Sequence, residues 1–172
     1  MATGKSIVGK RLAGKLKRQF ADLDELIELK EKRLIAEIFA KKGEPYFRKL
    51  EKEVLRQASG KGNFIYACGG GIVIDKDNLK IMKQTGTIIC LTAKPEVILK
   101  RIGSTSHRPL LDVPDPKKQI ELLLKMRAPY YACADKCVDT SKISVGEVVR
   151  KIEKLVGKPQ RVKAKTKTKK KR

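Results

Sequence analysis

The first residues of the chain, Thr3-Gly4-Lys5-Ser6, have the types and spacing of a phosphate-binding turn. A Gly-Lys-Ser that opens a helix is the second half of the pattern G-x-x-x-x-G-K-[ST]. In that pattern backbone N–H groups surround phosphates, the lysine reaches the outer phosphates and the hydroxyl binds Mg²⁺. The leading glycine would precede Met1, and Ala2 occupies an inner loop position. By itself the half-pattern also fits an ordinary polar helix start, so the rest of the chain must discriminate.

Two carboxylates, Asp22 and Asp24, follow the first predicted helix. We expect a short strand over residues 19–23, and residues two apart on a strand share a face, so both carboxylates would point the same way. The alternative is a helix N-cap, because Asp22 with Glu25 three residues later resembles a capping box.

Two arginines on predicted helices, Arg127 and Arg48, are candidates for binding an anionic group. Arg127 falls on the apolar stripe of a predicted helix, and a charge on a buried stripe requires a compensating group. The other members of that stripe are Ile120, Leu123 and Leu124. The alternative for Arg127 is a side chain that reaches solvent at the helix end. Arg48 is less telling, because Glu44 and Glu51 could pair with it along its own helix.

Three glycines, Gly69-Gly70-Gly71, follow the apolar run 64–68, which is typical of a strand buried on both faces. In open parallel sheets ligands bind beyond the carboxyl ends of the strands. A plain tight turn needs only one or two glycines, whereas three let the backbone approach a small polyol and offer it N–H groups. The segment 103–116 is long for a loop, and we expect it to be mobile and functional. It contains Arg108, which could equally be a solvated loop side chain, and His107, which we expect to be a bystander.

The elements that must position these residues alternate between strands and helices. Apolar runs predict strands over 19–23, 64–68, 87–91 and 136–139. Periodic apolar stripes predict helices over 5–17, 25–30, 34–42, 44–58, 75–84, 94–102, a segment ending near 134, and 145–156. This alternation predicts a three-layer α/β fold with a parallel sheet.

Composition and charge limit the class of protein. The 172 residues suit one domain, expected over 1–157, followed by a basic tail over 158–172 that we expect to be disordered. Removing the nine basic residues of the tail from the net charge of +22 leaves +13, which suits polyanionic ligands such as nucleotides. The sequence has no signal peptide and no apolar run of spanning length, which predicts a cytoplasmic protein without membrane contact. Its four cysteines include no C-x-x-C pair, so we expect reduced thiols and no zinc site.

Taken in order, these features resemble the shikimate kinase family. The resemblance runs from residue 1 to about residue 156 and is carried by six motifs. They are Ala2-Thr3-Gly4-Lys5-Ser6, Asp22-Leu23-Asp24-Glu25, Phe47-Arg48-x-x-Glu51, Gly69-Gly70-Gly71, Arg108-Pro109-Leu110-Leu111 and Arg127-Ala128-Pro129-x-Tyr131. The resemblance implies a P-loop fold like that of nucleoside monophosphate kinases, with strand order 2-3-1-4-5. It also implies a monomer that transfers the γ-phosphate of ATP to the 3-hydroxyl of shikimate in aromatic amino-acid biosynthesis.

The resemblance also implies roles for single residues. For ATP, Ala2, Thr3, Gly4 and Lys5 would form the phosphate site with Ser6, and Arg108 would close over the phosphates. Ser6 and Asp22 would hold Mg²⁺. Asp24 would be the general base for the attacking hydroxyl, and Lys5 would neutralise the β- and γ-phosphates. Shikimate itself would contact Asp24, Arg48, Gly70 and Arg127, with the two guanidinium groups gripping its carboxylate.

The sequence departs from the family at its start, because the strand that feeds the phosphate loop is missing. Losing four or five buried side chains costs on the order of 10 kcal/mol. We therefore expect a chain beginning at Met1 to fold poorly or bind ATP weakly, and Met1 to be an internal residue of the loop. A milder departure is Ile7, where the family usually has Thr. The alternatives are a related kinase such as gluconate kinase, an inactive derivative, and a basic protein whose tail makes weak, non-specific contact with nucleic acid.

Overall fold

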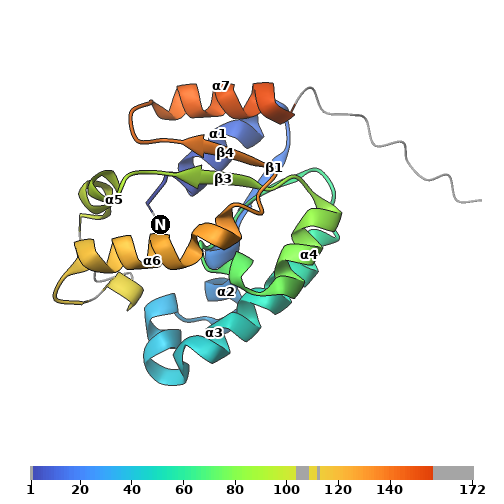
Figure 1. Ribbon diagram of the computed structural model, residues 1–172. Helices are drawn as coiled ribbons and strands as arrows, with labels where there is room; N and C mark the ends of the chain where they lie inside the picture. Colours follow the sequence, from blue (N-terminus) through green and yellow to red (C-terminus); the bar gives the residue numbers. More distant parts are fainter. Residues whose placement is uncertain (1, 104–108, 112, 157–172) are drawn as a thin grey trace, which may run out of the picture.

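The computed structural model of the protein describes residues 2–103, 109–111 and 113–156 (Figure 1). Its strands are β1 (Gln19–Asp22), β2 (Phe64–Ala67), β3 (Ile89–Thr92) and β4 (Lys136–Asp139). They form two parallel pairs, β1 with β2 and β3 with β4. Within the described ranges no strand joins β2 to β3. This is the arrangement that the order 2-3-1-4-5 leaves when its first strand is omitted.

The helices alternate with the strands as expected. They are α1 (Lys5–Leu16), α2 (Leu23–Glu31), α3 (Ile35–Ser59), α4 (Lys76–Thr85), α5 (Pro95–Ile102), α6 (Pro116–Tyr131) and α7 (Val145–Val156), with short 3₁₀ turns η1 (Ile72–Ile74) and η2 (Pro109–Leu111). The two helices predicted on either side of Gly43 are one kinked element, in which Gly43 takes a non-helical φ of 76° and ψ of 173°. A positive φ at that position suits glycine. The helix resumes after Gly43, with Pro45 near the start of this second part.

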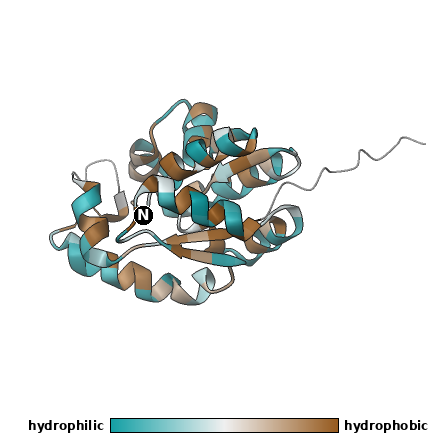
Figure 2. Ribbon diagram, turned by 90° about the horizontal axis from the view of Figure 1, so that it is seen from above, coloured by the Kyte–Doolittle hydropathy of each residue, from teal (hydrophilic) through white to brown (hydrophobic). Residues whose placement is uncertain are grey.

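Alternation along the strands places helices on both sides of them. Ile65 of β2 and Leu91 of β3 pack with α1 and α7, whereas Tyr66 of β2 packs with α2 and α3. Figure 1 shows α7 above β3 and β4, with α6 below them, and in Figure 2 the strands between the helices are largely hydrophobic. Because the adjacent residues Ile65 and Tyr66 point to opposite faces of β2, helices cover both faces of the strands. This confirms the predicted three layers.

A close approach between α1 and β1 sets the position of the phosphate loop. A Cβ placed on Gly9 would lie 2.6 Å from Cε2 of Phe20, so only glycine lets the helix pack this tightly against the strand. Val8 and Leu12 of α1 are buried against α7 and β4. Together these contacts fix the start of α1 beside the end of β1.

None of the helices in the described part of the chain is both long enough and apolar enough to cross a membrane.

Candidate active site

The start of α1 has the local geometry of an anion site. Gly4 precedes the helix in the left-handed conformation, with φ of 88°, and no side chain caps the helix. The first backbone N–H groups of a helix have no partner within it, and they are positively polarised. Lys5 and Ser6 form the first turn of α1, so a phosphate bound to those N–H groups would lie beside both side chains.

Asp22 connects this loop to the next helix through both of its carboxylate oxygens. Oδ2 accepts a hydrogen bond from the Ser6 hydroxyl at 2.5 Å, and Oδ1 accepts one from the backbone N–H of Asp24 at 3.1 Å. A hydroxyl and a carboxylate held this closely are hard oxygen ligands, which is the donor chemistry that Mg²⁺ prefers. The residues present therefore fit the metal that the sequence led us to expect.

The expected strand over residues 19–23 is wrong at its end. β1 stops at Asp22, and α2 begins at Leu23 with Asp22 as its N-cap. Asp24 thus lies in the first turn of a helix, and strand alternation does not set the direction of its side chain. The physical reason is that a carboxylate at this position satisfies an otherwise unpaired N–H of the helix. The N-cap alternative is confirmed for Asp22, and it coexists with the bond to Ser6.

The glycine loop is the point at which the distant motifs meet. A Cβ on Gly69 would lie 2.9 Å from Oε1 of Glu51 and 3.3 Å from Oδ1 of Asp24. A Cβ on Gly71 would lie between 2.5 and 2.7 Å from atoms of the Arg48 guanidinium. The two glycines are therefore required for close approach, and residues 69–71 lie against side chains from both α2 and α3.

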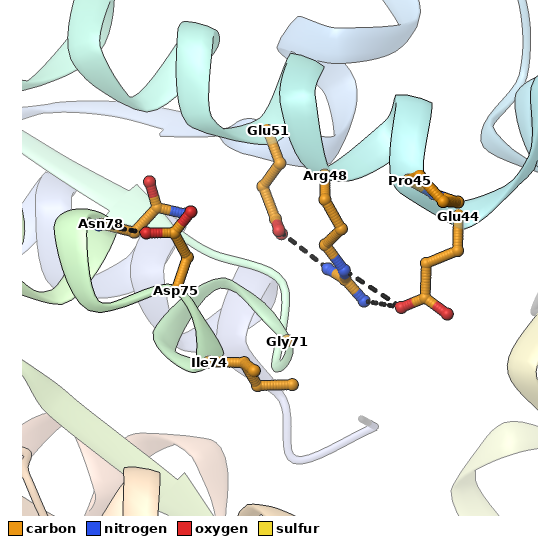
Figure 3. A pocket seen from close by; sticks show the side chains of 8 residues that line it. All are labelled: Glu44, Pro45, Arg48, Glu51, Gly71, Ile74, Asp75 and Asn78. Atoms are coloured by element: carbon orange, nitrogen blue, oxygen red, sulfur yellow. Dashed lines mark hydrogen bonds and ion pairs between the residues drawn. The ribbon is translucent and has the colours of Figure 1, made fainter.

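A cavity of about 490 Å³ opens beside this loop (Figure 3). Arg48 projects across it, with Nη2 at 2.8 Å from Glu44 and Nη1 at 2.7 Å from Glu51. Arg48 thus forms ion pairs with both Glu44 and Glu51, the two partners that the helical spacing allowed. The lining residues are Glu44, Pro45, Arg48, Glu51, Gly71, Ile74, Asp75 and Asn78. Three of the five N–H groups of the guanidinium are engaged, so two remain for an anionic ligand.

Glu51 was expected from the sequence only as a possible ion-pair partner of Arg48, and not as a site residue in its own right. Its side chain is 1% exposed, and its buried Oε1 has no hydrogen-bond partner among the described residues, nor has Oδ1 of Asn78 on the same cavity. Burial raises the pKa of Glu51 to about 7, against the opposing effect of Arg48 and with a further increase from Asp24. One signal could have revealed it. Glu51 falls on the buried stripe of α3 with Phe47, Leu50, Val54 and Leu55, an acid where an apolar residue is expected.

Replacing Glu51 by Gln should change how stability depends on pH. Because the folded-state pKa of about 7 lies above the ordinary 4.5, the stabilising contribution is complete below pH 4.5. It is lost as the pH rises through 7, by at most on the order of 3 kcal/mol. We expect urea unfolding at pH 4.5–8 to show this loss in the wild type and not in Glu51→Gln. Glu53→Gln, an exposed position on the same helix, should keep the wild-type slope. Equal slopes in all three proteins would contradict the prediction.

Arg127 lies on the buried stripe predicted for its helix, with Ile120 and Leu123, and is 6% exposed. Its charge acts on the hydroxyl of Tyr131, one helical turn later on α6. In the ranges that the structure describes, no carboxylate forms an ion pair with it. Its charge and that of Asp24 both act on Glu51, and Asp24, Gly70 and Arg127 thus lie around one loop.

A second cavity, of about 170 Å³, opens beside the phosphate loop. Its lining includes Thr3 and Gly4 from that loop, and Arg101 of α5. Arg101 donates hydrogen bonds to the hydroxyl and the carbonyl of Thr140, at 2.9 and 2.6 Å. The same hydroxyl donates to the carbonyl of Thr3 at 3.2 Å. Arg101 and Thr140 were not predicted as site residues, because no sequence pattern connects positions 39 apart.

Arg108 and His107 lie outside the described residues, as do the other residues of 104–108, residue 112 and the tail over 158–172. Their roles stay predictions.

Comparison with known proteins agrees with the resemblance seen in the sequence. The family model "Shikimate kinase" matches residues 1–156. A shikimate kinase of Caldanaerobacter subterraneus subsp. tengcongensis is 45% identical over 152 residues, which cover 88% of this chain and 89% of the relative. One of Thermoanaerobacter pseudethanolicus is 42% identical over 154 residues, covering 90% of each chain. The solved structure of shikimate kinase from Acinetobacter baumannii in complex with shikimate is 35% identical and matches with a TM-score of 0.88, over 91% of this chain and 88% of that one. This chain therefore belongs to the shikimate kinase family.

Proposed function

We propose that this protein transfers the γ-phosphate of ATP to the 3-hydroxyl of shikimate, giving shikimate 3-phosphate and ADP. The observation that carries the proposal is the meeting of Asp24, Glu51, Arg48 and Arg127 around the glycine loop, in a chain that belongs to this family. A carboxylate beside guanidinium groups suits an acceptor that carries both a hydroxyl and a carboxylate.

On the nucleotide side, phosphoryl transfer needs positioning and charge neutralisation rather than covalent help from the protein. The uncapped N-terminus of α1 and the Lys5 ammonium would bind the β- and γ-phosphates. Ser6 and Asp22 would hold Mg²⁺, which supplies further neutralisation of phosphate charge. The 170 Å³ cavity beside Thr3 and Arg101 would take the nucleoside part of ATP. With the phosphates bound at the start of α1, the γ-phosphate would lie between α1 and α2.

On the acceptor side, Asp24 would accept the proton of the attacking hydroxyl. It lies against Gly69, one residue from the predicted contact Gly70. Arg127 would bind the acceptor carboxylate, with Arg48 contributing its two uncommitted N–H groups. Closure of Arg108 over the phosphates stays a prediction, as do the monomeric state and the cytoplasmic location.

A coupled assay of ADP release, run with shikimate or gluconate as the acceptor, tests this function. We expect ADP release that depends on shikimate and on Mg²⁺. Faster turnover of gluconate would favour the alternative kinase, and no turnover with either acceptor would favour an inactive derivative. Deleting residues 158–172 distinguishes the kinase from the third alternative, a basic protein that binds nucleic acid. Such a protein would lose its function with the tail, whereas the kinase would keep its activity.

A further inference from the structure

The motif Arg127-Ala128-Pro129-x-Tyr131 contains a tyrosine to which substrate binding and catalysis give no role. Tyr131 is the last residue of α6 and lies four positions after Arg127, so the two side chains are neighbours on one face of the helix. The tyrosine is partly buried, on the side of α6 that carries the predicted carboxylate-binding group. Its hydroxyl is therefore close to the acceptor site without lining the cavity.

The hydroxyl of Tyr131 connects two elements that are far apart in the sequence. It donates a hydrogen bond to the carbonyl oxygen of Gly70 at 2.9 Å, and the charge of the Arg127 guanidinium, one helical turn earlier on α6, acts on it. Burial raises the pKa of Tyr131 above its ordinary value, against the opposing effect of Arg127, so the hydroxyl keeps its proton at neutral pH and remains a donor. Arg127, Tyr131 and Gly70 thus form one chain of neighbouring groups, in which a hydrogen bond joins Tyr131 to Gly70.

This chain fixes a peptide unit that has no side chain of its own to hold it. The carbonyl of Gly70 and the N–H of Gly71 belong to the same planar trans peptide, so fixing the carbonyl also fixes the direction of the N–H. Gly71 lines the 490 Å³ cavity and lies against Arg48. Ile72 is held separately, by Asn78 Nδ2 at 3.2 Å from its carbonyl. The turn after the loop is therefore anchored from α4, and the loop itself from α6.

We propose that the Tyr131 hydroxyl is a positioning group for the acceptor site, which holds Arg127 and the Gly70–Gly71 peptide at a fixed separation. The acceptor then meets its carboxylate-binding group and the glycine backbone in one geometry. The proposal rests on the proposed function for the identity of the acceptor. It does not require contact between Tyr131 and any substrate.

The variant Tyr131→Phe removes the hydroxyl and keeps the ring. We expect the KM for shikimate to rise roughly tenfold, because the hydrogen bond that orients the Gly70–Gly71 peptide is lost, while the KM for ATP stays at the wild-type value. The matched control is Tyr66→Phe, because Tyr66 also donates to a backbone carbonyl, that of Ala58 at 2.8 Å. We expect the control to lower the melting temperature as much as Tyr131→Phe does and to leave both KM values unchanged.

Coupling between the two side chains separates positioning from simple stability. In an Arg127→Met background, Tyr131→Phe should raise the KM for shikimate by a smaller factor than it does in the wild type, because the arginine and the glycine backbone orient the same acceptor. Additive effects in this cycle would overturn the proposal. So would an unchanged KM for shikimate in Tyr131→Phe, or equal increases in the KM for both substrates.

Hydrogen exchange at the amide of Ile72, which donates to the carbonyl of Gly69 at 3.3 Å across the Gly70–Gly71 turn, tests the same link without turnover. We expect exchange to be roughly tenfold faster in Tyr131→Phe than in the wild type or Tyr66→Phe. If the wild type fails to phosphorylate shikimate, the proposed function is wrong, yet faster exchange would still support the link from Tyr131 to Gly70. Unchanged exchange would overturn the positioning role, whatever the acceptor is.

Discussion

Replacing Asp24 by Asn lowers kcat for shikimate phosphorylation by about 10²–10⁴-fold, which is the contribution of a positioned general base. The amide keeps the size of the side chain and can still contact a hydroxyl, but it cannot accept the proton. Because Asp24 lies in the first turn of α2 and its backbone N–H is capped by Asp22, the substitution should leave the helix in place. The measurement is steady-state ADP release at saturating ATP, together with a thermal melt.

The control for Asp24 is its neighbour Glu25. Glu25 is exposed and forms a 3.9 Å ion pair with Lys10, so Glu25→Gln removes a charge from the same helical turn without touching the glycine loop. We expect wild-type kcat in this variant. A decrease below tenfold in Asp24→Asn, with the melting temperature unchanged, would exclude Asp24 as the base.

Replacing Arg127 by Met should raise the KM for shikimate by about 100-fold. A hydrogen-bonded charge pair is worth about 1.5–3 kcal/mol, and each 1.4 kcal/mol is a factor of ten. Met fills much of the space of the arginine stem, so the buried stripe with Ile120 and Leu123 should stay packed. The KM for ATP should not change, because Arg127 lies with the glycine loop and not with the phosphate loop.

An acceptor analogue makes this prediction specific. In the amide of shikimate the carboxylate is neutral, so the wild type should bind it much more weakly than shikimate, whereas Arg127→Met should treat the two alike. Lys125→Met, which removes an exposed charge from the same helix, is the control and should keep the wild-type preference. If Arg127→Met still discriminates between shikimate and its amide as the wild type does, another group binds the carboxylate.

Apolar periodicity and residue spacing were sufficient to predict the order of helices and strands and to choose most of the candidate site residues. Arg127 was found because a charge interrupts an apolar stripe, and the same signal is present at Glu51, where the sequence analysis stopped at the possibility of an ion pair. Asp22 shows the opposite case. Spacing alone allowed both a strand and an N-cap, and the hydrogen bond to the N–H of Asp24 decided between them.

The sequence by itself determined the alternation of strands and helices, the phosphate-binding start of α1 and the identity of the charged residues, because apolar periodicity and glycine placement are local properties of a chain. Only the tertiary structure decided which of those residues meet. The contacts of Gly69 with Glu51 and Asp24, of Gly71 with Arg48, and of Tyr131 with Gly70 join segments separated by up to 61 positions. The raised pKa of Glu51 also depends on the tertiary structure, because its burial and its neighbouring charges exist only once α2, α3 and α6 have packed around the loop.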